Sequence, residues 1–255
     1  MAEENSLKEL LAVSCRIIGK LNMTKEPSGH VSARIPGSEN IYIKARGRAE
    51  SGLRFVTTRD FITVDMDGRK LDGLAELDVP QEVFIHTEVY RSRPEVQSVI
   101  HVHPLTVVLF TICDMPLLPL TGAYDPSALR LVTEGIPTYP RSVLISNAAL
   151  GRDLSAAIGR QRACLMRGHG ITAAGTSVQD ATLTAIKLNE IAEVNYRARL
   201  LGEPRPISDE DLKSFTPTHE RMKASGAYVE SAWRYYCTLL DEPVISPSSD
   251  KSDRG

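Results

Sequence analysis

The 255-residue sequence has no marked excess of either charge: 30 lysines and arginines stand against 32 aspartates and glutamates, a formal net charge of −2. Such a balance offers no basis for binding nucleic acid or an anionic membrane surface. The sequence also lacks an apolar run of about 18 residues, and its polar opening, MAEENSLKELL, is typical of a helix start rather than of a secretion signal. With 42% hydrophobic residues, the composition excludes a disordered chain and is that of a globular protein.

Cysteine is scarce and scattered. The four cysteines are Cys15, Cys113, Cys164 and Cys237, and no two of them have the C-x-x-C spacing of a zinc ribbon or a thioredoxin motif. We expect all four to be buried core thiols, because free cysteine behaves mostly as a small apolar residue. Dispersed thiols in a chain of this length also fit a reducing compartment, which predicts a cytoplasmic protein.

Helical and strand patterns alternate along the sequence without a domain-scale linker, which predicts one α/β domain over residues 1–242. The Asp67-Gly68 pair predicts a tight type I′ hairpin turn, and the Pro/Ser/Asp-rich residues 243–255 are expected to form a disordered tail. Helices are expected at 6–21, 78–93, 147–158, 178–201 and 225–240, and strands at 31–35, 41–44, 61–65, 69–71, 96–103, 163–167 and 171–175.

Three of the six histidines occur where local geometry makes them useful. His101 and His103 are two residues apart on a predicted strand, so their side chains share one face with about 7 Å between the Cα atoms. That spacing suits two imidazoles that bind one cation. His169 lies between Gly168 and Gly170, which let the backbone turn sharply. Taken singly, each motif is also compatible with an ordinary core or turn histidine.

An acid and a fourth histidine occur at the start of the helix predicted for residues 78–93. Glu82 falls in its first turn, where the helix dipole favours a carboxylate whatever its function. His86 follows one turn later on the same face. From the residues alone, His86 is either a contact to a bound substrate or a satisfied core histidine.

Together these residues form a recognisable pattern. PQE at 80–82, HVHP at 101–104 and LMRGHG at 165–170 closely resemble the class II aldolase/adducin family. The resemblance covers nearly all of the chain, from the first helix to the WRYY motif at 233–236. It implies the class II aldolase fold, an α/β/α sandwich with a central, mostly antiparallel sheet. It also implies a homotetramer with sites at the subunit interfaces.

The resemblance further implies a metal-dependent lyase. In this family the acid at the position of Glu82 is the catalytic acid/base, and the histidines matching His101, His103 and His169 hold one divalent metal ion per subunit. Zinc, manganese, iron, cobalt and magnesium are all candidates. Three imidazoles leave open metal positions, as catalytic sites do, so the metal can act as a Lewis acid while Glu82 moves a proton.

The sequence departs from the sugar-phosphate aldolases of the family where they bind phosphate. Those enzymes use a Gly-Asn pair, a Thr-Gly loop and a Ser-Ser pair, whereas this chain has Gly29-His30, KARG at 44–47 and Pro80-Gln81. The replacement set of His30, Lys44 and Arg46 suits a carboxylate, although Lys44 and Arg46 can equally be solvated loop charges.

These departures resemble the branch that decarboxylates dihydroxyaryl acids such as dihydroxyphthalate. That resemblance implies a small aromatic acid as substrate, with its ring oxygens at the metal and its carboxylate held by His30 or Arg46. His86 and Tyr236 are expected to be further substrate contacts, the latter from the C-terminal aromatic region that closes the site across a subunit boundary.

Three other functions stay open at this point. An aldolase acting on a non-phosphorylated hydroxy-keto acid would use the same metal and Glu82. An Fe(II) oxygenase is compatible because three histidines can hold Fe(II). A non-catalytic adducin-like scaffold would not need the complete set of three histidines and an acid, which argues against it.

Overall fold

The computed structural model describes residues 2–215 and 226–240, with side chains described from residue 6 onward. The tail predicted for residues 243–255 lies outside the described residues. None of the helices within the described ranges is long and apolar enough to cross a membrane.

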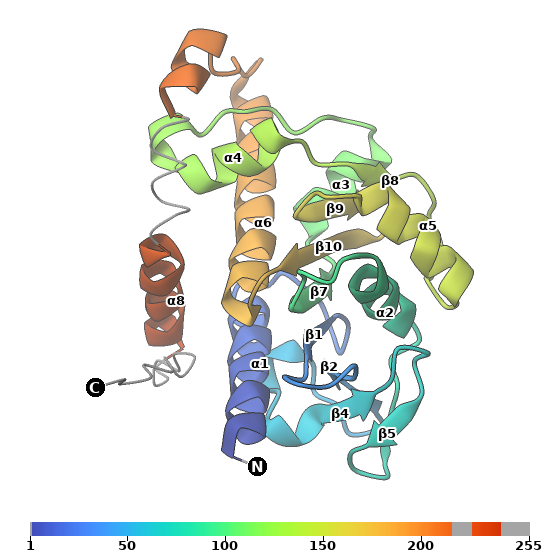
Figure 1. Cartoon of the computed structure of the whole chain (residues 1–255). Coiled ribbons are helices and arrows are strands. Elements are labelled where there is room, and N and C mark those ends of the chain that lie inside the picture. The colour runs from blue at the N-terminus through green and yellow to red at the C-terminus, as the bar shows by residue number, and fades with distance from the viewer. Residues whose placement is uncertain (1, 216–225, 241–255) are drawn as a thin grey trace.

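An eight-stranded sheet forms the middle of the molecule, in the spatial order β5-β4-β2-β1-β7-β10-β9-β8 (Figure 1). Every neighbouring pair is antiparallel except β8 with β9, so the mostly antiparallel sheet expected from the sequence is confirmed. The strands of this sheet are β1 (His30–Arg34), β2 (Ile41–Lys44), β4 (Phe61–Val64), β5 (Lys70–Asp72), β7 (Ser98–Val102), β8 (Thr138–Tyr139), β9 (Ala163–Met166) and β10 (Gly170–Gly175). Two short strands, β3 (Arg46–Gly47) and β6 (Leu77–Asp78), pair separately.

Helices cover both faces of the sheet, which confirms the α/β/α sandwich (Figure 1). One face packs against α1 (Ala2–Lys20) and α6 (Val178–Leu201), and around α6 lie α3 (Leu105–Ile112), α4 (Pro126–Glu134) and α8 (Ala227–Leu239). The opposite face packs against the paired helices α2 (Val83–Ser92) and α5 (Ala148–Ile158). Short 3₁₀ turns occur at η1 (Leu53–Phe55), η2 (Thr58–Asp60) and η3 (Gly122–Tyr124), and residues 209–215 are helical.

Side chains alternate along the central strands between these two helical layers. In β1, Val31 and Ala33 enter the core beneath α1 and α6, whereas Ser32 points the other way and hydrogen-bonds to residues of α2. In β7, Ile100 belongs to the first core and Val99 to the second. The period of two along a strand therefore supplies both layers from one stretch of sequence.

Local capping explains several of the observed helix boundaries. Asn147 and Ser177 precede α5 and α6, and the side chain of each accepts a hydrogen bond from the backbone of the first turn. Asp125 caps α4 in the same way, followed by Pro126. The helices α3 and α4 were not among the elements expected from the sequence. For α4, the Asp125-Pro126 pair was the sequence signal that could have predicted the start of the helix.

The hairpin between β4 and β5 does not contain the expected type I′ turn. Only Gly68 of the loop has a positive φ, +78°, whereas a type I′ turn needs two such residues in succession. Asp65 accounts for the difference, because its Oδ1 accepts hydrogen bonds from the backbone N–H groups of Asp67 and Arg69. The loop is therefore one residue longer than the two-residue loop of a type I′ hairpin, and Gly68 adopts the left-handed conformation.

The expectation of four buried thiols is wrong for one cysteine. Cys15, Cys164 and Cys237 are buried, but Cys113 is exposed where α3 ends. All four thiols are free. Burial raises the pKa of Cys15 and of Cys164 to about 12, so these two thiols stay protonated and inert.

Candidate metal centre

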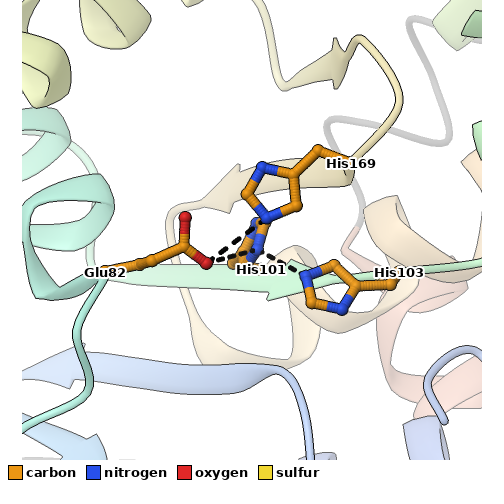
Figure 2. A group of neighbouring side chains, drawn as sticks. All are labelled: Glu82, His101, His103 and His169. Atoms are coloured by element: carbon orange, nitrogen blue, oxygen red, sulfur yellow. Dashed lines mark hydrogen bonds and ion pairs between the residues drawn. The ribbon is translucent and has the colours of Figure 1, made fainter. Parts of the chain in front are cut away.

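Four polar side chains converge where β7 ends: Glu82, His101, His103 and His169 (Figure 2). Their potential ligand atoms all lie within 4.8 Å of one another. His101 belongs to β7 and His169 to the turn between β9 and β10. Because β10 pairs antiparallel with β7, that turn lies beside the end of β7. Residues distant in sequence are thereby brought to one point.

His103 lies just beyond β7 rather than within it, which corrects the strand boundary expected from the sequence. Its Nε2 is nevertheless 2.8 Å from Nε2 of His101, so the expected convergence of the two rings is confirmed. Gly170 permits this approach: a Cβ on it would lie 2.3 Å from the carbonyl oxygen of Val102 and 2.7 Å from the His103 ring. On the other side of His169, Gly168 has φ of +58°.

Glu82 is the residue immediately before α2, not a member of its first turn, and its side chain makes no capping hydrogen bond. Instead Oε1 accepts a hydrogen bond of 2.9 Å from the backbone N–H of Ile145. Oε2 lies 3.5 Å from Nε2 of His101 and 3.3 Å from Nε2 of His169. Burial raises the pKa of Glu82, and hydrogen bonds donated by the His101 and His169 rings lower it more strongly, so the carboxylate is ionised when a proton lies between it and those rings.

His101 is oriented as a metal ligand. Its Nδ1 lies 3.0 Å from the carbonyl oxygen of Ile171, and a carbonyl can only accept, so we infer that Nδ1 carries the proton. The lone pair of Nε2 then points into the cluster, the arrangement usual for metal-binding histidines. Burial also lowers the pKa of His101, and that of His103 to about 3, so both rings are neutral as ligation requires.

The cluster fits a divalent metal ion on the chemistry of its donors. A bare Nε2 of His101 and the ionised Oε2 of Glu82 are two acceptors facing each other across 3.5 Å. Such an arrangement is unfavourable unless a proton or a cation lies between them. Four ligands at about 2.0–2.2 Å from one tetrahedral metal are roughly 3.4 Å apart. The separations of 3.3 and 3.5 Å from Glu82 to the two histidines are close to that value, whereas the 2.8 Å between Nε2 of His101 and Nε2 of His103 is shorter.

A chain of buried hydrogen bonds adjoins the cluster. His30 of β1 pairs across the sheet with His101, and their ring centroids are 5.1 Å apart. Nδ1 of His30 lies 2.7 Å from Nε2 of His86, and Nδ1 of His86 lies 2.6 Å from Oγ of Ser32. Ser32 in turn lies 2.8 Å from the hydroxyl of Tyr90. His30 therefore lies beside the candidate metal ligand His101 and His86 lies behind His30, and the substrate roles expected of both stay predictions.

Ser32 and Tyr90 had no role in the sequence interpretation, although a signal for them exists. Ser32 is two residues from His30 on the same strand, and Tyr90 is four residues from His86 on the same helix. Ser32 therefore lies on the same face of β1 as His30, and Tyr90 lies on the same face of α2 as His86.

The structure separates Lys44 from His30. Ser32 pairs with Ile43 across β1 and β2, so these two side chains share a face, and Lys44 points to the opposite one. The Lys44 amine is buried in an ion pair with Glu50. Arg46, half-exposed, is 4.0 Å from the same carboxylate. The expected carboxylate-binding set of His30, Lys44 and Arg46 is thus not assembled around the histidines, and the roles of Lys44 and Arg46 stay predictions.

Tyr236 lies in α8, and in this structure its side chain contacts α6. Its hydroxyl donates a hydrogen bond of 3.2 Å to Oε1 of Glu190 in α6. Glu190 and Asp125 both pair with Lys187, so the phenol belongs to a polar group that joins α4, α6 and α8. The substrate role assigned to Tyr236 stays a prediction.

Comparisons with known proteins agree with this geometry. Residues 9–196 match the family model of the class II aldolase and adducin N-terminal domain. The chain is 38% identical over 211 residues to a 3,4-dihydroxyphthalate decarboxylase of Terrabacter sp. (strain DBF63), covering 80% of this chain and 87% of that protein. It is 33% identical over 233 residues to the Arthrobacter keyseri protein of the same name, covering 89% and 91%. The solved structure of an aldolase II superfamily protein from Pseudomonas syringae has the same fold, with a TM-score of 0.81, 21% identity and 94% of each chain covered.

Proposed function

Because the chain belongs to the class II aldolase and adducin family, we propose that it is a metal-dependent lyase that removes a carboxylate from a dihydroxylated aromatic acid. The observation that carries the proposal is the convergence of three imidazoles and one ionised carboxylate on a single point. The match to dihydroxyphthalate decarboxylases over most of the chain supports the choice of substrate class.

His101, His103 and His169 hold one divalent metal ion in this proposal. Imidazole suits zinc, iron or cobalt better than magnesium or manganese, which prefer oxygen ligands. When bound, the metal supplies Lewis-acid chemistry that draws electrons toward oxygens next to the bond being broken.

Glu82 moves the proton. As an ionised carboxylate beside the metal ligands, it can take the proton of a ring hydroxyl on Oε2. The carbon–carbon bond then breaks, carbon dioxide leaves, and the bonding electrons remain in the ring. Glu82 returns its proton to the ring carbon that lost the carboxylate, and water later restores the hydroxyl proton. Ile145 keeps the carboxylate in place through both transfers, because its backbone N–H holds Oε1.

The remaining parts of the expectation are also proposals. His30 contacts the substrate from β1, with His86 of α2 hydrogen-bonded behind it, and the half-exposed Arg46 binds a carboxylate of the substrate. A homotetramer with sites at subunit interfaces, to which Tyr236 contributes, follows from the family. A cytoplasmic location fits the four free thiols.

A substrate panel with metal analysis tests the proposal. Purified protein is analysed for bound metal and incubated with 3,4-dihydroxyphthalate, with 2,3-dihydroxybenzoate, and with hydroxy-keto acids. Carbon dioxide release without oxygen uptake, lost on chelation and restored by metal, is the expected result. Pyruvate and an aldehyde from the keto acids would instead identify an aldolase. Oxygen uptake would identify an oxygenase, and inactivity with every compound would favour a scaffold.

A further inference from the structure

The hydrogen-bonded chain from Tyr90 to His30 has a buried end and an end beside the metal centre. His86, Ser32 and Tyr90 are at most 1% exposed, whereas His30 is 8% exposed. The order of contacts is Tyr90 hydroxyl, Ser32 Oγ, His86 and then His30. Because each link joins two groups that can either donate or accept, the direction of one bond determines the direction of all the others.

Tyr90 determines that direction. Ser32 Oγ is the acceptor that the described chain offers to its hydroxyl, and a buried donor left without an acceptor is costly. Ser32, having accepted from Tyr90, has one proton to give. Nδ1 of His86 at 2.6 Å is a far better acceptor for it than the carbonyl oxygen of Val99 at 3.5 Å.

The same logic continues to the metal centre. With Nδ1 of His86 accepting, its proton is on Nε2, which donates to Nδ1 of His30. The neutral ring of His30 then carries its own proton on Nε2. That N–H has no partner among the described residues, and the ring lies beside that of His101. Burial lowers the pKa of His86 to about 3, so this ring does not escape the constraint by binding a second proton at neutral pH.

We propose that Tyr90 and Ser32 are positioning residues that act through His86 to hold His30 as the Nε2-protonated tautomer, which donates a hydrogen bond to an anionic oxygen of the substrate. The inference rests on the proposed function for the nature of that substrate. A carboxylate only accepts hydrogen bonds, so it binds this tautomer and is repelled by the lone pair of the other. Lys44 does not serve in its place, because Glu50 already neutralises its amine.

The tautomer can be observed without turnover. Zinc-loaded protein labelled with ¹⁵N in histidine gives nitrogen signals that separate proton-bearing from bare ring nitrogens, and the six histidines are few enough to assign with a His30→Gln variant. We expect His30 to carry its proton on Nε2 alone. In Tyr90→Phe, Ser32 is free to accept from His86, so the Nδ1-protonated form of His30 should appear. A bare Nε2 or a doubly protonated His30 in the wild-type protein overturns the inference.

Steady-state kinetics of the variants provide a second, independent test. Tyr90→Phe keeps the buried ring and should raise the KM for 3,4-dihydroxyphthalate about tenfold or more, the weight of one hydrogen bond to a charged group, with a much smaller change in kcat. The matched control is Thr87→Val in the same helix, since the Thr87 hydroxyl is also buried but has no hydrogen-bond partner in the described part of the chain. A KM that rises no more in Tyr90→Phe than in Thr87→Val overturns the inference.

The tautomer measurement and the kinetics together distinguish a failure of this inference from a failure of the proposed function. An Nε2-protonated His30 in a protein that decarboxylates none of the aromatic acids contradicts the proposed function but supports the tautomer. Full decarboxylase activity with a bare Nε2 contradicts only the role given to Tyr90 and Ser32.

Discussion

The two faces of the central sheet differ in what strands β1 and β7 bury on them. Toward α1 and α6, these strands present Val31, Ala33, Ile100 and Val102, all of which belong to one apolar core. Toward α2, the same strands present His30, Ser32 and His101, which are buried as well. One strand thus contributes alternately to stability and to chemistry, and the separation is enforced by the pleat.

The difference shows how a polar site can be buried at modest cost. A buried polar group that lacks a partner costs about 1–3 kcal/mol. On the α2 face, the buried polar groups of Tyr90, Ser32, His86 and His30 hydrogen-bond to one another in sequence. In the histidine–glutamate cluster, by contrast, Nε2 of His101 faces Oε2 of Glu82 at 3.5 Å. The imidazole nitrogens of this cluster are the atoms expected to bind a metal ion.

The largest effect is expected from His101→Ala. Removal of this imidazole takes away the ligand held in place by the Ile171 carbonyl, so bound metal and carbon dioxide release should both fall to background. Metal analysis and the decarboxylase assay measure the two quantities. One equivalent of metal retained per chain would show that the cluster is not the metal site.

Glu82→Gln should lower turnover about 10²–10⁴-fold, the usual contribution of an acid–base group, while the three imidazoles keep the metal. Glu88→Gln is the matched control, because Glu88 is also buried but pairs with Arg91 at 3.5 Å, outside the cluster. Full activity in Glu82→Gln would end the assignment of proton transfer to this carboxylate.

Ile100→Ala tests the opposite face next to His101. Ile100 is fully buried in the apolar core, so truncation should lower the free energy of unfolding by about 2–5 kcal/mol. Urea denaturation measures this loss. Activity per folded molecule should persist, because the side chain points away from the site, and a matching loss of kcat would mean that the two faces are coupled.

The smallest effect at neutral pH is expected from His86, which makes stability depend on pH. Burial, and then the neighbouring His101, lower its pKa from 6.5 to about 3. Between those values the unfolded chain binds a proton that the folded one does not, so stability falls as the pH is lowered. The slope is about 1.4 kcal/mol per pH unit for this one group. In metal-free His86→Gln, the stability measured from pH 6.5 to 4 should decline less steeply by that amount, and an unchanged slope would contradict the assigned cause.

Local patterns in the sequence predicted most of the elements near the site. The glycines around His169, the alternating residues of β1 and β7 and the helices 147–158 and 178–201 all depend on neighbours a few positions away. The same patterns misplaced Glu82 and His103 by a few residues relative to α2 and β7. They also gave no indication of α3, and Cys113 at its end was wrongly expected to be buried.

The sequence by itself determined which chemistry-bearing groups exist and which face of its own element each one shares, because side-chain direction repeats every two residues in a strand and every three to four in a helix. Only the tertiary structure decided their partners. Glu50 pairs with Lys44 on the far face of the sheet, and Glu190 accepts from Tyr236. Ser32 meets Tyr90 from 58 positions away. Such pairings depend on how separate elements pack, and no periodicity within one element contains that information.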